Sequence, residues 1–199
     1  KAMVDTMARD FESFVSRRGN EFEWLSAESP SGGTVGDKLE SSNSSDLIFF
    51  SGSTERYDGE IGVSGKDNGG DVSCIGYKLF YADPVSKGGN KFKTFILRRI
   101  LVNPDLTFKN LLGQKDLETA FGTYSTKLDD IENFVCENVY QFTVTFNVEV
   151  TSGVGANAKL VTVPVTVGQS SSGQMTKSFK VKGTGIDTEV TTNTVTSDE

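Results

Sequence analysis

The chain has 199 residues, of which 27 are acidic and 20 are basic, so its formal net charge at pH 7 is −7. Nucleic-acid-binding proteins normally present a basic face, so this charge argues against a nucleic-acid partner. The chain also has no histidine, which excludes Ser-His-Asp and Cys-His catalysis and zinc sites with histidine ligands. The composition favours a structural or binding protein over an enzyme, and we predict no cofactor.

Residues 2–18 carry the clearest helical period of the chain. Apolar side chains recur there at spacings of three and four residues, at Met3, Val4, Met7, Phe11, Phe14 and Val15. Charged side chains, Asp5 and Asp10 among them, cover the other side. The period is already present at Lys1 without a capping residue, so we predict the lower part of a longer helix whose beginning has been removed.

Three apolar runs follow, and each predicts a strand. Residues 47–50 form a short run bounded by Ser and Gly, which is typical of a buried strand. Residues 74–81 and 92–101 are separated by turn-forming residues, so we expect them to pair as a hairpin. Between them and the C-terminal half, Asn103 and Pro104 favour a short helix or a turn.

The second half of the chain predicts further strands. Apolar and polar residues alternate strictly from Tyr140 to Val150, which indicates a strand with one buried and one solvated face. Residues 160–167 predict another strand, and Pro164 favours an edge position because proline has no N–H to donate. The Thr-rich, acidic residues 188–199 predict a polar, flexible tail or an added edge strand.

The strands cluster in sequence and do not alternate with helices, which predicts an α+β class with an antiparallel sheet. We expect a single domain over residues 1–187, in which the long N-terminal helix packs on the sheet through its apolar stripe.

Two features could support binding or cross-linking. Cys74 and Cys136 lie in strand-like runs, where they could form a disulfide or remain as two buried thiols. Asp67 and Asp71 flank a loop rich in oxygen ligands and glycine, which calcium uses. The spacing does not match an EF-hand, so a solvated turn is the simpler interpretation and we predict no metal site.

The order of several short motifs resembles the minor pseudopilins of type II secretion, especially the J-type, and the prepilin-like proteins of the Verru_Chthon cassette group. The motifs lie in residues 3–150 and are Met7-Ala8-Arg9-Asp10-Phe11, Val15-Ser16-Arg17-Arg18, Leu47-Ile48-Phe49-Phe50, Ile75-Gly76-Tyr77-Lys78-Leu79, Leu97-Arg98-Arg99 and Glu137-Asn138-Val139-Tyr140-Gln141-Phe142.

The resemblance implies a pilin-like fold and a structural role in a type II secretion or type IV pilus-like filament. It also implies a periplasmic domain, anchored in the inner membrane by an apolar helix preceding Lys1, with other minor pseudopilins as partners. The N-terminal helix would then be the assembly element. The alternative that the residues leave open is a secreted or cell-surface β-rich domain that binds a glycan or a protein.

Overall fold

The structure is a computed structural model. It describes residues 2–29, 33–35, 38–40, 44–53, 70–84, 91–124, 133–153, 155, 158–168 and 174–192. Asp67 lies outside these ranges, as do the acidic residues Asp129, Asp130 and Glu132.

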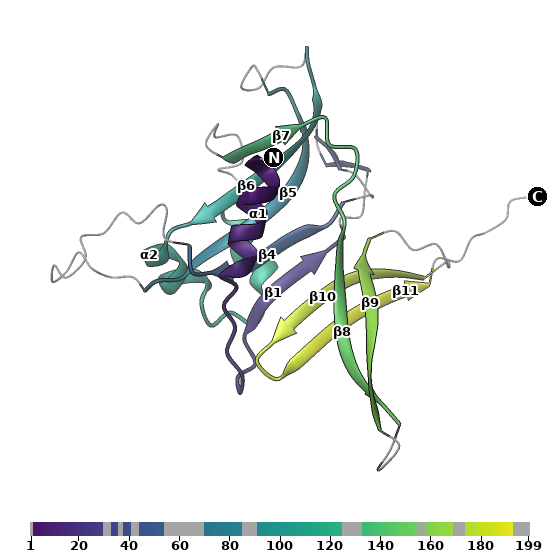
Figure 1. Ribbon diagram of the computed structural model, residues 1–199. Helices are drawn as coiled ribbons and strands as arrows, with labels where there is room; N and C mark the ends of the chain where they lie inside the picture. Colours follow the sequence, from purple (N-terminus) through teal and green to yellow (C-terminus); the bar gives the residue numbers. More distant parts are fainter. Residues whose placement is uncertain are drawn as a thin grey trace, which may run out of the picture.

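About half of the described residues belong to one nine-stranded sheet (Figure 1). Its strands run in the order β7-β6-β5-β4-β1-β10-β9-β8, and β11 pairs with β10. Their bounds are β1 Glu23–Glu28, β4 Asp46–Ser51, β5 Ser73–Ala82, β6 Thr94–Val102, β7 Phe134–Glu137, β8 Val144–Ser152, β9 Lys159–Val167, β10 Gln174–Lys182 and β11 Gly185–Thr192. The other elements are helix α1 Ala2–Glu12, a small sheet of β2 Gly33–Val35 and β3 Lys38–Glu40, and the helices α2 Pro104–Leu106, η1 Thr107–Leu111 and α3 Leu117–Gly122.

The central strands form where the apolar runs predicted them. β5 and β6 pair antiparallel from Cys74↔Val102 to Ala82↔Thr94, which confirms the predicted hairpin. β4 covers the predicted run 47–50 and is buried on both faces. The side chain of Asn103 accepts a hydrogen bond from the N–H of Leu106 and caps α2, as the Asn-Pro pair indicated.

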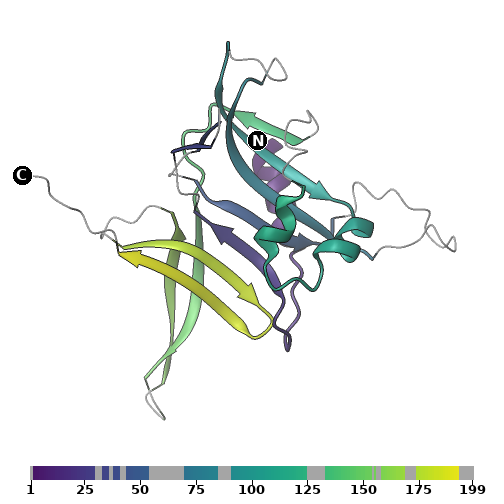
Figure 2. The same cartoon turned by 180° about the vertical axis from the view of Figure 1, so that it is seen from behind.

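Alternate residues of the central strands supply two separate cores, one on each face of the sheet. The first, here called the α3-side core, consists of Trp24, Ile48, Phe50, Cys74, Ile100, Val102, Leu111, Leu117, Phe121 and Tyr124. The second, the α1-side core, consists of Leu25, Ala27, Leu47, Phe49, Ile75, Tyr77, Leu101, Val167 and Phe179. The short helices α2, η1 and α3 cover the first face, as Figure 2 shows from behind.

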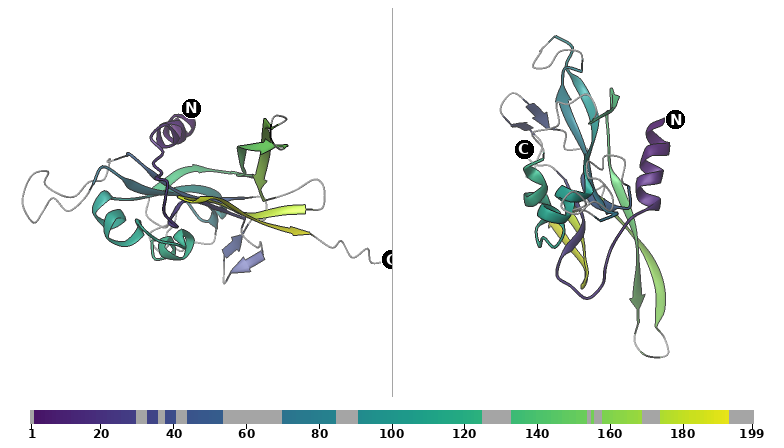
Figure 3. Two further views of the ribbon diagram at one scale, coloured as in Figure 1. Left: turned by 90° about the horizontal axis from the view of Figure 1, so that it is seen from below. Right: turned by 90° about the vertical axis from the view of Figure 1, so that its left-hand side faces the viewer.

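Helix α1 and the hairpin of β8 and β9 lie on the opposite face (Figure 3, left). β8 and β9 pair antiparallel over their full length, from Val144↔Val167 to Ser152↔Lys159. This hairpin, here called the arm, joins the rest of the sheet at the parallel pair Thr176↔Val167 and at the adjoining bridge of Gly168 with Thr176, in which Gly168 donates its N–H to the carbonyl of Thr176 at 3.0 Å. Its root also stacks the Phe146 ring on Phe179, with ring centroids 4.1 Å apart.

The sheet forks at this point. One edge of β10 pairs with β1 from Lys182 back to Ser178. Beyond Ser178 the neighbour of β10 is β9, which pairs with Thr176. The pairing of β10 with β11 is also irregular between Thr176 and Ser178. β1 and the arm therefore diverge from one strand, and the arm extends past the edge of the domain (Figure 3, right).

The prediction of a pilin-like α+β fold with a long N-terminal helix on the sheet is wrong. The chain is mostly β, its sheet is mixed, and the N-terminal helix ends at Glu12 rather than at residue 18. The cause is competition from β4, because Val15 donates its N–H to the carbonyl of Phe50 at 2.9 Å, and Ser13 accepts from Gly52 at 2.8 Å. Residues 13–15 therefore satisfy their backbone on the sheet instead of continuing the helix.

Two further boundaries differ from those predicted. The strand expected from Tyr140 begins at Val144, and Tyr140 itself is exposed. At the C-terminus, Thr188 pairs with Phe179 within β11, so the first residues of the predicted tail form the added edge strand that was the alternative. In the described part of the chain, no helix is long and apolar enough to cross a membrane.

Candidate functional site

Helix α1 is fixed to the sheet by a buried charged contact. Asp10 is fully buried, and its carboxylate accepts two hydrogen bonds from Arg99 of β6, from Nε at 2.6 Å and from the terminal nitrogen Nη2 at 2.7 Å. The hydroxyl of Tyr77 donates to the same carboxylate at 2.5 Å. A planar two-point ion pair of this kind fixes direction as well as distance, so it sets how the helix lies on the sheet.

The end of the helix is held by a second group of hydrogen bonds. Ser51 donates its hydroxyl to the backbone carbonyl of Asp10 at 3.0 Å, and it shares a hydrogen bond with Ser13. Ser13 also donates its hydroxyl to the carbonyl of Arg9. These contacts satisfy carbonyl groups that the last helical turn would otherwise leave without an intrahelical partner.

The side of α1 away from the ion pair is divided into an apolar and a polar flank. Val4, Ala8 and Phe11 follow one another at helical spacing and are exposed, with Val4 60% exposed. Asp5, Arg9 and Glu12 form the next flank. We call Val4, Ala8 and Phe11 the apolar strip. The domain itself leaves Val4 and Ala8 uncovered, whereas Phe11 is 37% exposed because its ring stacks on Phe49.

The six residues predicted for helix packing and assembly do not form one buried stripe. Met7 packs against the α1-side core, and Val15 packs against the α3-side core. Phe11 stacks on Phe49 at 4.7 Å, and Phe14 contacts the same ring at 6.2 Å, although both remain partly exposed. Met3 is half-buried, and Val4 points to solvent.

The two cysteines are free thiols that face different surroundings. Cys74 is buried in the α3-side core, whereas the sulfur of Cys136 lies 3.2 Å from the sulfur of Met3 in α1. Burial raises the pKa of the Cys74 thiol well above its ordinary value and raises that of Cys136 as well. The disulfide that the sequence left open is therefore not formed.

The calcium candidates are not brought together as a site. Asp71 is exposed, and Asp67 falls outside the described residues. Among the residues that the structure does describe, no group of three or more His, Cys, Asp or Glu side chains could hold a metal ion.

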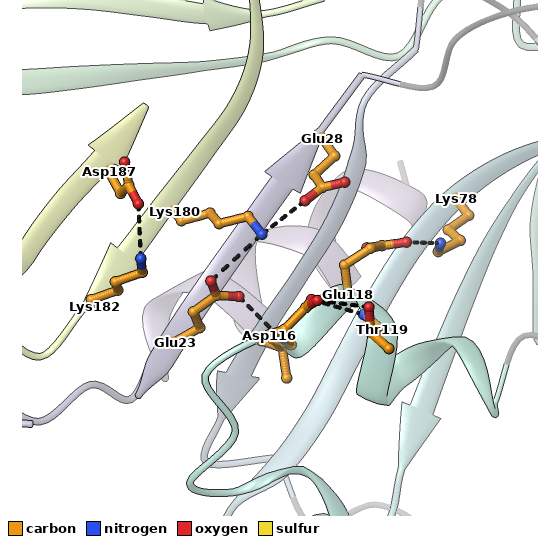
Figure 4. Close-up of polar contacts among 10 residues, drawn as sticks. Glu23, Glu28, Lys78, Asp116, Glu118, Thr119, Lys180, Lys182 and Asp187 are labelled. Atoms are coloured by element: carbon orange, nitrogen blue, oxygen red, sulfur yellow. Dashed lines mark hydrogen bonds and ion pairs between the residues drawn. The ribbon is translucent and has the colours of Figure 1, made fainter. Parts of the chain in front are cut away.

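A second polar cluster lies on the face covered by α3 (Figure 4). Glu23 of β1 is buried, accepts the N–H of Leu117 at 2.8 Å and lies 3.5 Å from the amine of Lys180. Lys180 also pairs with Glu28 at 3.0 Å. This cluster satisfies the first N–H of α3 and attaches that helix to β1 and β10, which is a structural task.

The lysine of β5 makes a similar attachment further along the sheet. Lys78 pairs with Asp46 of β4 at 3.0 Å and with Glu118 of α3 at 2.8 Å. Although burial opposes the charge on Lys78, these two carboxylates outweigh that effect and raise its pKa. Asp116 caps α3 by accepting from Thr119, and this hydrogen bonding lowers the pKa of Asp116.

Sequence reasoning found the apolar residues of α1 but missed the contact that positions them. The helical pattern predicts Asp10 on the solvated side, together with the other charged residues of the helix. Arg99 is 89 positions away, and no local pattern connects the two. The one available signal was Arg98-Arg99 inside an otherwise apolar strand, because a buried arginine requires a partner.

Comparison with known proteins gives no match to a family model, to a curated protein or to a solved structure.

Proposed function

We propose that the chain is a structural subunit of a type II secretion or type IV pilus-like filament, a minor pseudopilin-like protein that assembles through α1. The observation that carries this proposal is the apolar strip on a helix that Asp10 and Arg99 hold in one direction. The partners would be other minor pseudopilins, and the place of assembly would be the periplasmic side of the inner membrane.

The physical argument starts from the exposure of the strip. Val4 and Ala8 are presented to solvent, and Phe11 in part, on a helix that has a polar flank beside them. Apolar side chains that gather on one side of an exposed helix favour contact with another chain. A head-to-tail contact between different surfaces of neighbouring subunits produces a filament when its rotation does not close a ring.

The buried ion pair gives such a contact a defined geometry. A helix attached only by apolar contacts could rotate or slide with little cost, whereas the carboxylate of Asp10 meets Arg99 at two points and Tyr77 at a third. The proposal therefore depends on how α1 is held, and it does not require a long helix on the sheet.

The test is cross-linking at the strip in cells that build the filament. The full-length protein carries Val4→Cys together with Cys136→Ser, and a short reagent is added that has a thiol-reactive maleimide at one end and a photoreactive benzophenone, which inserts into C–H bonds of a neighbouring chain, at the other. We expect a cross-linked species that contains this chain and another pseudopilin. Glu12→Cys in the same background is the matched control, because Glu12 is an exposed position of the same helix on the polar flank.

A charge substitution gives the functional readout. Val4→Lys is expected to reduce incorporation of the subunit into the filament at least ten-fold, whereas Glu12→Lys leaves incorporation unchanged. Both positions are exposed, so neither substitution is expected to change folding by more than about 0.5 kcal/mol. Normal incorporation of the Val4→Lys protein, together with no cross-linked pseudopilin, would overturn the proposal.

A further inference from the structure

The outer part of the arm is exposed on both faces, and the arm belongs to neither of the polar clusters. We propose that β8 pairs edge to edge, antiparallel, with β8 of a second copy of this chain, on a two-fold axis through Val148. The inference concerns a different surface from the apolar strip of α1, so it stands whether or not the chain is a pseudopilin.

The first observation is the exposure of the arm. Phe146, Val148 and Val165 contact the α1-side core at its root. Further out, on the same face, Val150, Val161 and Val163 are 41%, 42% and 41% exposed. The apolar face of the arm thus continues from a packed root into a part that the domain does not cover, which leaves surface for another chain.

The second observation is the difference between the two edges of the arm. In the described part of the chain, β8 has β9 as its one strand partner, so the other edge of β8 is open. Natural proteins protect open edges with charged side chains, most often Lys, with Pro or with a short strand, and β8 has one charged residue, Glu149. β9 has Pro164 and Lys159, whereas β8 runs for nine residues as Val-Thr-Phe-Asn-Val-Glu-Val-Thr-Ser without Pro or Lys. An edge of this length with so little protection favours strand addition.

The third observation identifies the occupant. The arm has one acidic residue, Glu149, and one basic residue, Lys159, so its strands carry no net charge in a chain whose net charge is −7. The arm also extends beyond the domain (Figure 3, right). When two copies pair through their arms, the acidic remainders of the two chains stay apart. Salt screens the repulsion between them beyond a Debye length of about 8 Å.

The register follows from the alternation of β8 and from its single charge. An axis through Val148 places Phe146 opposite Val150 of the second copy and keeps all apolar side chains on one face. The same axis places Asn147 opposite Glu149, so the two acidic groups do not face each other. A shift of the axis to Glu149 would put the two carboxylates directly opposite, which is unfavourable.

The size of the contact predicts its strength. Stable interfaces bury roughly 800 Å² on each partner, and a nine-residue strand edge supplies less than that. We therefore expect a weak dimer, with a dissociation constant on the order of 100 μM, that forms at high local concentration.

Disulfide trapping tests the register directly. Asn147→Cys and Glu149→Cys are made as separate proteins in a Cys136→Ser background, and each is oxidised alone and in an equimolar mixture. We expect a disulfide-linked dimer in the mixture and little in either protein alone. A mixture of Glu149→Cys with Thr151→Cys is the control, because it has the same spacing but corresponds to an axis through Val150.

Charge substitutions test the same pairing at equilibrium. Asn147→Glu places acidic groups opposite each other at two symmetric positions, so it should weaken dimerisation by about five-fold at low salt. Adding Glu149→Lys to Asn147→Glu should restore or exceed the original affinity. Sedimentation equilibrium up to millimolar concentration measures both. A wild-type chain that stays monomeric over this range, or trapping of the control mixture instead, would overturn the proposal.

Discussion

Asp10 and Arg99 meet at two hydrogen bonds of 2.6 and 2.7 Å, although 89 positions separate them in the sequence. Both side chains are buried, so the contact joins the first helix of the chain to strand β6 inside the protein. In a buried pair each charge depends on the other, because neither is solvated by water.

Removal of Asp10 is therefore expected to be costly. Asp10→Ala leaves Arg99 buried without this counter-charge and should lower the free energy of unfolding by about 3 kcal/mol. Urea unfolding measures the change. Asp5→Ala is the matched control on the exposed flank and should change stability by less than about 0.5 kcal/mol. Equal effects of the two substitutions would contradict the importance of the pair.

Because of Tyr77, we expect the free energy of unfolding to fall at alkaline pH. Its burial, together with its hydrogen bond to the charged Asp10, raises the pKa of Tyr77 well above the ordinary 10.0. The folded state therefore favours the neutral form of Tyr77. The contribution of this form to the free energy of unfolding is complete below pH 10 and falls as the pH rises above 10.

The comparison with Tyr77→Phe isolates this effect. At pH 8 the variant should be less stable by about 1–2 kcal/mol, because it lacks the hydrogen bond to Asp10. At pH 11 the tyrosine ionises in the unfolded state. The gap, which is the difference in free energy of unfolding between the wild-type protein and the variant, should therefore narrow by about 1.4 kcal/mol. Urea unfolding at the two pH values measures the gap. A gap that stays constant would show that Tyr77 ionises equally in both states.

Gly76 is expected to tolerate no side chain. A Cβ at Gly76 would lie 2.5 Å from two ring atoms of Phe121, which is buried in the α3-side core. Gly76→Ala should therefore destabilise the protein by about 2–3 kcal/mol. Thermal unfolding provides the measurement.

Gly122 supplies the control for this prediction. It lies next to Phe121 in α3, and a Cβ there would have open space. Gly122→Ala should leave stability unchanged or raise it by up to about 1 kcal/mol, since alanine favours a helix. If both substitutions have the same effect, the close approach of Phe121 to β5 is incorrect.

The two thiols are expected to react at different rates. Cys136 is partly exposed, whereas Cys74 is fully buried with its pKa raised well above the ordinary value. Iodoacetamide should label Cys136 in the native protein and Cys74 only after unfolding, and peptide mass spectrometry identifies the labelled residue. Native Cys136→Ser protein should take up no label. Rapid labelling of Cys74 would indicate an open α3-side core.

The strands could be predicted from the sequence where burial is two-sided or alternates strictly. Local pattern and tertiary burial agree in the apolar residues 47–50, 74–81 and 92–101. The structure places β4, β5 and β6 there. The length of the helix could not be predicted in this way. Phe14 and Val15 continue the helical period, but their backbone is also suited to a strand, and hydrogen bonding to β4 decides the outcome.

The candidate site was predictable only in part, for a related reason. Val4 and Phe11 are visible as apolar residues at helical spacing, but which of them the sheet covers depends on the rotation of α1. That rotation is set by Asp10, Arg99 and Tyr77, which come from three separate segments. Local periodicity carries no information about such a long-range pair.

The fork at β10 gives the arm a mechanical property of its own. The nine residue pairs of the arm are held at one end only, which acts as a pivot. That end is fixed by the backbone pairs of Thr176 with Val167 and Gly168, by the stack of Phe146 on Phe179, by apolar packing on the α1-side core and by the hydroxyl of Ser45, which donates to the carbonyl of Val167. Load applied near Val150 and Val161 is therefore concentrated at the pivot, so under tension the arm should swing as a rigid rod before the central strands begin to separate.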